Sequence, residues 1–427
     1  MRYHRTVIAL LLLVPIASQG HAQNAAPPER ETIQQLVQQV KELQNKVAVL
    51  ESQQRSSSTP GPPEPTSAPP PSASEEASTT PPESLLRELH ELRGIQWRGF
   101  GELDYKVLSQ RKPELGTFGF DPGSHGNFYT GDFDLFLTSR ISDKASVVSE
   151  IAFGEGDAQS FNVDLERFLL KYDFNDHLKM SFGRYQTGIS FYNSEFRTAR
   201  WFLTTADRPL ITEFAAEGGL LPTQAVGVSL TGLIPSGRLG LNYLFEYGSS
   251  DTVRPNIDGS GQVDDENNGN HINIGFFFRP EAVPGLQIGG SFYHDKISDS
   301  NLPSSIRIGQ TIVNAHVVYL AHGFEILNEG FLIRHAPENS TTVSNMPAFY
   351  SQFSKRFGHI RPFFRYQYVN TNKEDTIFDD VGLRYGPSFG ARYDFNDNIA
   401  LKAQLDHTLR KGQPDLNGLN LQLVFNF

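Results

Sequence analysis

Apolar and polar side chains alternate along most of this chain, from Ile95 to its last residue, Phe427. The closing segment LNLQLVFNF shows the pattern, with Leu or Phe at every odd position of 419–427 and polar residues at all even positions except Val424. A repeat of two is that of a β-strand with one apolar and one polar face. Such a strand fits a soluble sheet, and it also fits a barrel whose outer face contacts lipid.

The same alternation predicts sixteen strands, although 324–336 and 346–357 alternate poorly. The predicted strands lie near 95–106, 128–141, 145–154, 162–174, 177–186, 223–234, 238–248, 271–280, 286–297, 305–320, 324–336, 346–357, 360–372, 380–395, 399–410 and 417–427.

The connections between the predicted strands alternate between short and long. Short turns such as SDK at 142–144 and GH at 358–359 take turns with long loops such as 107–127, 187–222 and 249–270. This sorting is typical of an outer-membrane barrel, in which the short turns lie in the periplasm. A soluble β-sandwich gives no reason for it, and a β-propeller would show internal repeats, which the sequence lacks. The sequence therefore predicts an all-β fold, a 16-stranded antiparallel transmembrane β-barrel over residues 95–427.

Charged residues identify the face of each strand that cannot contact lipid. In the predicted strand 399–410, Leu401 and Leu405 fall on one face and Lys402 and Arg410 on the other. A charge on the lipid face costs about 2–4 kcal/mol at mid-membrane, so the charged face must line a water-filled lumen. Clustered Arg and Lys can line an anion path, and the alternative is that acids in the lumen pair with most of them. The basic residues placed inside in this way include Arg361, Arg365, Arg384, Arg392 and Lys402.

Three segments precede the predicted barrel. Residues 1–22 have the basic start, apolar run and small residues of a secretory signal peptide. Residues 23–54 carry apolar positions spaced alternately by three and four from Ile33 to Leu50, which predicts a coiled-coil helix in the periplasm. Residues 55–94 are rich in Pro, Ser and Thr and predict an extended linker followed by a short helix.

The long connection 187–222 is unusually rich in aromatic residues, Trp201 and Phe202 among them. A loop this apolar is not expected to be freely solvated, and the lumen wall is the nearest surface against which it can pack. It would then narrow the pore and bring Arg197, Arg200 and Arg208 to the constriction. The alternative is an extracellular cap that packs on its own aromatic side chains.

The stretch VDLERFLLKYDFNDHLKMSFGRYQTGISFYNSEFRTARWFLTTADRP, residues 163–209, resembles the phosphate-selective porin O and P family. Members share a strand, a turn, a strand end similar to GRY at 183–185 and a third loop that bears acids and arginines. The resemblance extends loosely over 95–427 and implies a trimeric sixteen-stranded porin that passes anions such as phosphate. It makes Arg184, Arg197, Arg200 and Arg208 candidates for the anion path and the constriction.

Composition and motifs narrow the remaining classes of function. The chain has no cysteine, which removes disulfides, thiol nucleophiles and thiolate metal sites. Its net charge of −11 argues against a nucleic-acid partner. The sequence shows no GxSxG, HExxH, P-loop or GxGxxG motif, and its histidines are scattered. No enzyme activity, metal site or cofactor is therefore expected.

The expected function is that of a porin in the outer membrane of a Gram-negative bacterium. It would let small hydrophilic solutes diffuse passively, with anions such as phosphate preferred. Its expected partners are the outer-membrane lipids and further copies of the chain in a homotrimer. A second hypothesis is a structural anchor whose coiled coil and linker reach the cell wall and contact peptidoglycan. A barrel hydrolase that uses Ser and His is a third class, which no motif supports.

Overall fold

The computed structural model describes residues 95–109, 126–155, 161–196, 199–214, 219–250, 270–298, 307–338, 340–379 and 381–427. The predicted signal peptide, coiled coil and linker lie outside these ranges and remain predictions. Among the described residues, no helix is long and apolar enough to cross a bilayer.

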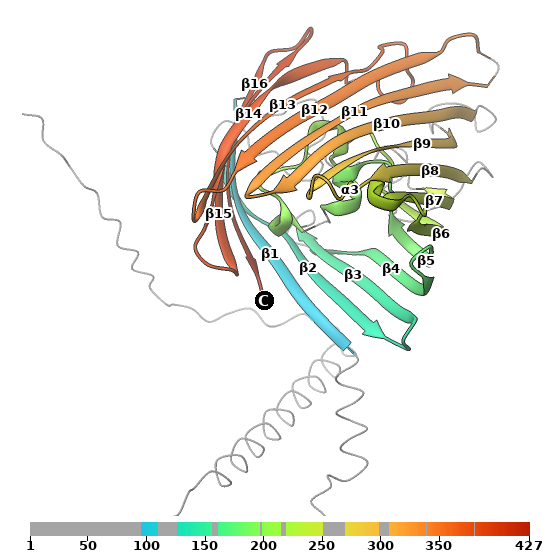
Figure 1. Ribbon diagram of the computed structural model, residues 1–427. Coiled ribbons are helices and arrows are strands. Elements are labelled where there is room, and N and C mark those ends of the chain that lie inside the picture. The colour runs from blue at the N-terminus through green and yellow to red at the C-terminus, as the bar shows by residue number, and fades with distance from the viewer. Residues whose placement is uncertain are drawn as a thin grey trace, which may run out of the picture. The chain divides into compact units, whose positions relative to one another are not determined.

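Sixteen antiparallel strands close into one barrel, in which each strand pairs with its neighbours in sequence and β1 pairs with β16 (Figure 1). The predicted 16-stranded barrel is therefore confirmed. The strands are β1 Ile95–Leu108, β2 Asn127–Arg140, β3 Ala145–Glu155, β4 Phe161–Asn175, β5 Leu178–Gln186, β6 Gln224–Leu233, β7 Leu241–Ser250, β8 His271–Phe278, β9 Leu286–Ser298, β10 Arg307–Ala321, β11 Phe324–Pro337, β12 Ser344–Lys355, β13 Ile360–Asn370, β14 Leu383–Asp394, β15 Ile399–Arg410 and β16 Leu416–Asn426.

Strand boundaries agree with the predicted ones to within a few residues, and the two largest differences have local causes. The strand predicted from 238 begins at Leu241, because Gly237–Leu239 forms a 3-10 turn and Gly240 takes a left-handed φ of 57°. The strand predicted from 380 begins at Leu383, because the residues before it belong to a loop that packs inside the barrel. Short connections follow β2, β4 and every second strand after them, which defines a short-turn end and a long-loop end.

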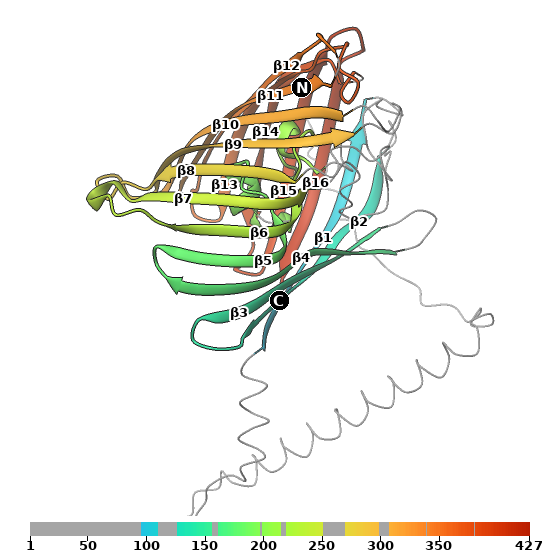
Figure 2. The same cartoon turned by 90° about the vertical axis from the view of Figure 1, so that its right-hand side faces the viewer.

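The two faces of each strand separate as the sequence predicts. In β15, Lys402 and Gln404 are buried inside the barrel, whereas Leu401 and Leu405 are exposed on the outside. Figure 2 shows β7–β12 side by side. Most of the large apolar side chains exposed on these strands alternate with buried residues and therefore lie on the outer face. An apolar outer belt around a polar interior is the arrangement that a lipid surface requires.

The C-terminal strand closes the barrel against the first strand. Phe425 lies opposite Gly101, and the backbone groups of Phe427 and Gly99 exchange two hydrogen bonds of 3.0 Å. The two terminal rings lie over these glycines: a Cβ on Gly101 would come within 2.6 Å of the Phe425 ring, and one on Gly99 would overlap the Phe427 ring. Closure removes both free sheet edges, and the glycines make room for the aromatic residues at the seam.

Candidate functional site

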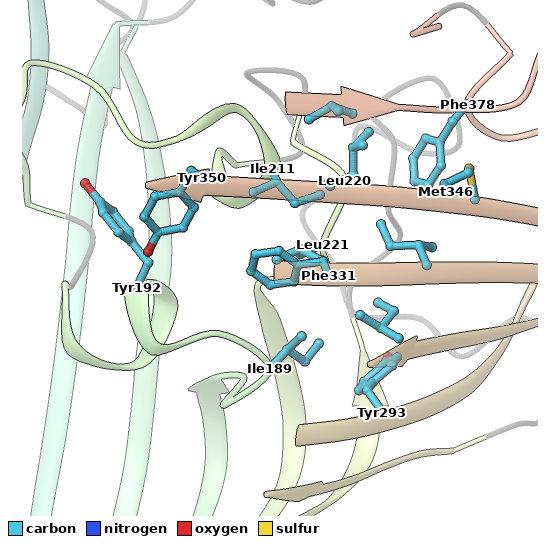
Figure 3. Close-up of a cluster of buried hydrophobic side chains, with 14 of the residues drawn as sticks. Ile189, Tyr192, Ile211, Leu220, Leu221, Tyr293, Phe331, Met346, Tyr350 and Phe378 are labelled. Atoms are coloured by element: carbon cyan, nitrogen blue, oxygen red, sulfur yellow. The ribbon is translucent and has the colours of Figure 1, made fainter. Parts of the chain in front are cut away.

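The connection between β5 and β6, residues 187–223, is described at 187–196, 199–214 and 219–223, and these parts turn into the barrel and pack on the inner face of β9–β13 (Figure 3). It contains the short helix α3 Phe191–Glu195 and the 3-10 turns η3 Arg200–Phe202 and η4 Leu210–Thr212. The expectation that this loop packs on the lumen wall is confirmed. The buried cluster joins Ile189, Tyr192, Ile211, Leu220 and Leu221 of the loop to Tyr293, Phe331 and Tyr350 of the wall.

One wall carboxylate, that of Glu329 in β11, holds the start of α3. It accepts hydrogen bonds from the backbone N–H groups of Phe191 and Tyr192, both at 2.9 Å, and from the Ser190 hydroxyl at 3.1 Å. The first N–H groups of a helix have no partner within the helix, and an anion placed there satisfies them. Glu329 therefore acts as a cap supplied by the barrel wall. The other donors to this carboxylate are Asn314 at 3.1 Å and Tyr350 at 2.5 Å.

A second carboxylate and one amide hold the two ends of the loop together. Glu246 of β7 accepts a hydrogen bond from the backbone N–H of Gly188 at 3.0 Å. The Asn193 side chain donates to the carbonyls of Thr187 and Thr223, at 2.8 and 3.0 Å. Because Thr187 enters the loop and Thr223 leaves it, Asn193 fixes the distance between its ends.

Basic side chains of β14 and β15 donate hydrogen bonds to carbonyl oxygens in the middle of the loop. Lys402 of β15 donates to the carbonyls of Arg200 and Thr205, at 2.5 and 3.1 Å. Arg392 of β14 donates to two carbonyls between them, at 2.6 and 2.9 Å. Carboxylates of the wall thus accept hydrogen bonds from the N–H groups at the start of the loop, and basic side chains of the wall donate to the carbonyls in its middle.

Asp207 links the same loop to β13 and β15. Arg365, which is fully buried, donates to the Asp207 carboxylate and, at 3.0 Å, to its backbone carbonyl. Gln404 donates to the carboxylate at 2.7 Å. Burial alone would raise the pKa of Asp207, but the Arg365 guanidinium and the Gln404 amide bring it below its ordinary value. Asp207 is therefore charged at neutral pH.

Five of the candidate basic residues from the sequence lie on β13–β15 and contact loop segments. Three of them, Arg365, Arg392 and Lys402, make the contacts described above. Arg361 donates to the Thr204 hydroxyl at 3.2 Å and is 3.5 Å from a carboxylate oxygen of Glu325. Arg384 donates to the backbone carbonyl of Val381 at 2.8 Å. The structure brings these five residues into one sector, which we call the basic sector.

The other candidates do not join that sector. Arg200 pairs with Glu213 at 3.3 Å within the loop. Arg208 donates to carbonyl and amide oxygens of the loop and lies over two of its aromatic rings, so it stabilises the fold of the loop. Arg184 donates to a glutamine amide of β6. Arg197 lies outside the described residues.

A cavity of about 280 Å³ lies beside the loop, along β4–β10. One side of it is formed by α3. Side chains of both charges line it, among them Lys171, Glu195 and Glu246. The lining also includes uncharged polar side chains, Ser181, Ser229, Thr231, Gln287, Asn314 and His316, and the apolar side chains of Leu169, Phe191, Leu244 and Phe277.

Carboxylates gather on the inner face of β1–β4, next to the basic sector. Glu150 pairs with Arg167, which also lines the cavity. Glu102 accepts a hydrogen bond from the backbone N–H of Asp132 at 3.1 Å, and Asp134 is buried close by. We call this group the acidic sector. This part of the wall also contacts the loop, because the Phe100 ring of β1 lies 4.9 Å from the Phe202 ring of η3.

A second loop, residues 371–382, also packs inside the barrel. The Asp375 carboxylate is 2.8 Å from His335 Nδ1 and accepts the backbone N–H groups of Ile377 and Phe378 at 3.0 and 2.9 Å. Phe378 is fully buried and stacks on the His335 ring. Burial alone would raise the pKa of Asp375, whereas His335 and the two N–H groups lower it.

The main residue that sequence reasoning missed is Glu329. The period of two places it inward, together with Phe331 and Ile333, so the predicted inner face of this strand mixes charge with apolar residues. That mixture is the cause of the poor alternation at 324–336, because the inner face of β11 is covered by the loop. An inward apolar stretch in a water-filled barrel is therefore a usable signal for the place where a loop packs.

Comparison with known proteins shows the fold. No family model matches the chain, and no curated protein matches it by sequence. An anion-selective porin from Comamonas acidovorans has a TM-score of 0.55 at 10% identity, over 78% of this chain and 99% of that one. The outer membrane channel DcaP of Acinetobacter baumannii gives 0.55 at 10% identity, over 78% and 97%. The trimer form of OmpT, an outer membrane protein of Vibrio cholerae, gives 0.51 at 11% identity, over 78% and 99%.

Proposed function

We propose that this protein is a porin of the Gram-negative outer membrane, through which small hydrophilic solutes diffuse passively. The observation that carries the proposal is the loop 187–223, which charged wall residues hold inside a closed barrel beside a cavity with polar and charged lining residues. A loop anchored in this way narrows the lumen, so solutes are selected by size and by the field of fixed charges. No bond has to be made or broken, and the proposed protein is not an enzyme.

We propose anions such as phosphate as the preferred solutes. The proposal is supported by the basic sector, which gathers five basic side chains on β13–β15, and by Lys171 and Arg167 at the cavity, where Glu195 and Glu246 also lie. It is also supported by the sequence resemblance at 163–209. A preference for cations is the second candidate, because the acidic sector lies on the wall while the cations of the basic sector already bind the loop.

Planar-bilayer recording tests both the proposed porin activity and the proposed preference for anions. A potassium chloride gradient across the bilayer gives a reversal potential whose sign reports anion or cation preference, and phosphate is then substituted for chloride. We expect stepwise conductance with anion preference, which Lys171→Gln weakens and Asp132→Asn strengthens. The absence of conductance from a folded barrel would refute the porin, and a cation-selective reversal potential would refute only the anion preference.

One group of Ser, His and Asp side chains in the structure can be compared with the catalytic triad that a hydrolase would need. Ser250, His271 and Asp295 lie on the adjacent strands β7, β8 and β9. However, the Ser250 hydroxyl donates to Asp295, and His271 contacts the Tyr185 hydroxyl at 3.2 Å. A catalytic triad needs the serine bonded to the histidine, and this arrangement does not supply that contact.

We further propose a homotrimer, which the resemblance supports and which chemical crosslinking in membranes would test. The structural role as an anchor is compatible with the porin. In that case residues 23–94 bind peptidoglycan in the periplasm, and deleting them would release the protein from isolated cell walls without lowering its conductance.

A further inference from the structure

The outer face of β9–β12 carries a row of polar side chains at the long-loop end of the barrel. Thr311 of β10 pairs with His294 of β9 and with Arg334 of β11, and Arg334 pairs with Asn345 of β12. These four residues therefore sit side by side on adjacent strands. Figure 2 shows the strands β9–β12 next to one another on one side of the barrel. Lys296 lies one outward position further along β9. We call these five residues the polar row.

The row lies at the edge of the apolar belt. The next outward positions toward the short-turn end are Phe292, Val313, Leu332 and Pro347, which pair with one another across the same four strands. Phe292, Val313 and Leu332 are exposed by 48%, 45% and 43%. The outer surface thus changes from bulky apolar groups to hydrogen-bonding groups within one step of the strand repeat, as it does where acyl chains meet headgroups.

The charges of the row are those of a site for anions. Arg334 is exposed on the outer face, and its guanidinium can bind a phosphate through two parallel N–H groups. His294 contacts the Thr311 hydroxyl at 3.0 Å, which sets two polar groups beside it. Lys296 is 3.2 Å from Glu338, and both side chains remain about half exposed. The carboxylate of Asp295 belongs to the buried inner face and does not reach this surface.

We propose that the polar row binds the phosphate-bearing headgroup of a lipid in the leaflet at the long-loop end, with the acyl chains on the apolar belt. This inference rests on the proposed function, since it requires that the barrel spans a membrane. A phosphate accepts charge-assisted hydrogen bonds from Arg334 and Lys296, while His294 and Asn345 border it. The hydrocarbon of the same molecule covers the exposed Phe292 and Leu332, which a soluble anion would leave in water.

Native mass spectrometry of the full chain in detergent tests the proposal. The probes are a bisphosphorylated lipid A, the same lipid without its phosphates, and inorganic phosphate. We expect the bisphosphorylated lipid to bind, and each of Arg334→Gln and Lys296→Gln to weaken its binding about fivefold. Arg334→Lys should retain most of the affinity. The control is Arg238→Gln, which removes an exposed cation at the short-turn end and should leave lipid binding unchanged.

Three outcomes would overturn the proposal: equal binding of the dephosphorylated lipid, equal effects of Arg238→Gln and Arg334→Gln, or binding of inorganic phosphate as tightly as of the lipid. Resistance of each variant to sodium dodecyl sulfate without heating confirms that its barrel is folded. Bilayer recording of the unaltered protein separates this test from that of the proposed function. A barrel that binds the lipid and does not conduct would refute the porin alone, and one that conducts and ignores the phosphates would refute the lipid site alone.

Discussion

Replacement of Glu329 by alanine should release the start of the loop 187–223 from the barrel wall. The carboxylate accepts hydrogen bonds from two backbone N–H groups of α3, two hydroxyls and one amide, at 2.5–3.1 Å. Glu329 is 3% exposed, so water does not readily replace these contacts. Glu329→Ala leaves the N–H groups of Phe191 and Tyr192 and the Tyr350 hydroxyl without their partner.

The size of the effect follows from the number of donors and their burial. A hydrogen bond to a charged group contributes about 1.5–3 kcal/mol, but the five bonds to one carboxylate do not add independently. A donor left buried without its partner costs about 1–3 kcal/mol, so removing the carboxylate from these neutral donors should cost about 3–5 kcal/mol in total. At 1.4 kcal/mol for each factor of ten, the ratio of docked to undocked loop should fall by a factor of about one thousand. The barrel hydrogen bonds are untouched, so the barrel itself should still fold.

Single-channel recording and limited proteolysis read out this release. Glu329→Ala should give a larger and noisier conductance, because an undocked loop no longer narrows the lumen in a fixed position. The loop should also be cleaved faster while the strands stay intact. Glu329→Gln, which retains one acceptor oxygen of similar shape, should lie between the unaltered protein and Glu329→Ala. Leu332→Ala is the matched control, since it removes an outward side chain from the same strand.

Unchanged conductance and unchanged protease resistance in a folded Glu329→Ala barrel would refute this reasoning. The apolar cluster and the cations of the basic sector would then suffice to hold the loop, and the cap at α3 would contribute little.

Three further predictions concern other anchors. Asp375 has a pKa below its ordinary 3.8, so it contributes stability that is complete above about pH 4 and is lost as the pH falls through the lowered pKa. Hydrogen exchange in 371–382, measured between pH 5 and pH 2, should show this loss in the unaltered protein and not in Asp375→Asn. Identical exchange profiles of the two proteins would refute the contribution of Asp375. Gly99→Ala should lower the yield of heat-modifiable, folded barrel, because the added methyl group overlaps the Phe427 ring. The double variant with Phe427→Ala should lose less folded yield than the two single variants combined, and simple additivity would show that the ring and the glycine do not interact. Lys402→Met removes the lysine donor from the Arg200 and Thr205 carbonyls, of which Arg200 keeps a hydrogen bond from the Leu203 N–H, and it should increase fluctuations of the single-channel current. A quiet channel with normal conductance would show that Arg392 holds this segment alone.

The sequence predicts the inward placement of the basic side chains that hold the loop, but it does not predict their contacts with the loop. The period of two places Lys402, Arg392 and Arg365 inward, and the charge cost in lipid makes that placement secure. The sequence alone favoured a free anion path for these side chains. The structure shows their donors on loop carbonyls and on Asp207, which is a contact between residues about 160–200 positions apart. Local patterns carry no information about such pairs.

The sequence by itself determined the architecture, because strand alternation and turn length are local properties that each act within a few residues. It predicted sixteen strands, their inward and outward faces and the pairing of the last strand with the first, and the closed barrel confirms the strand count and this pairing. The tertiary structure alone decided what the lumen charges do. Whether an inward arginine faces water or a loop depends on where the loop folds, and that follows from Glu329 at one end and Lys402 at the other, brought to one loop only by the closed barrel.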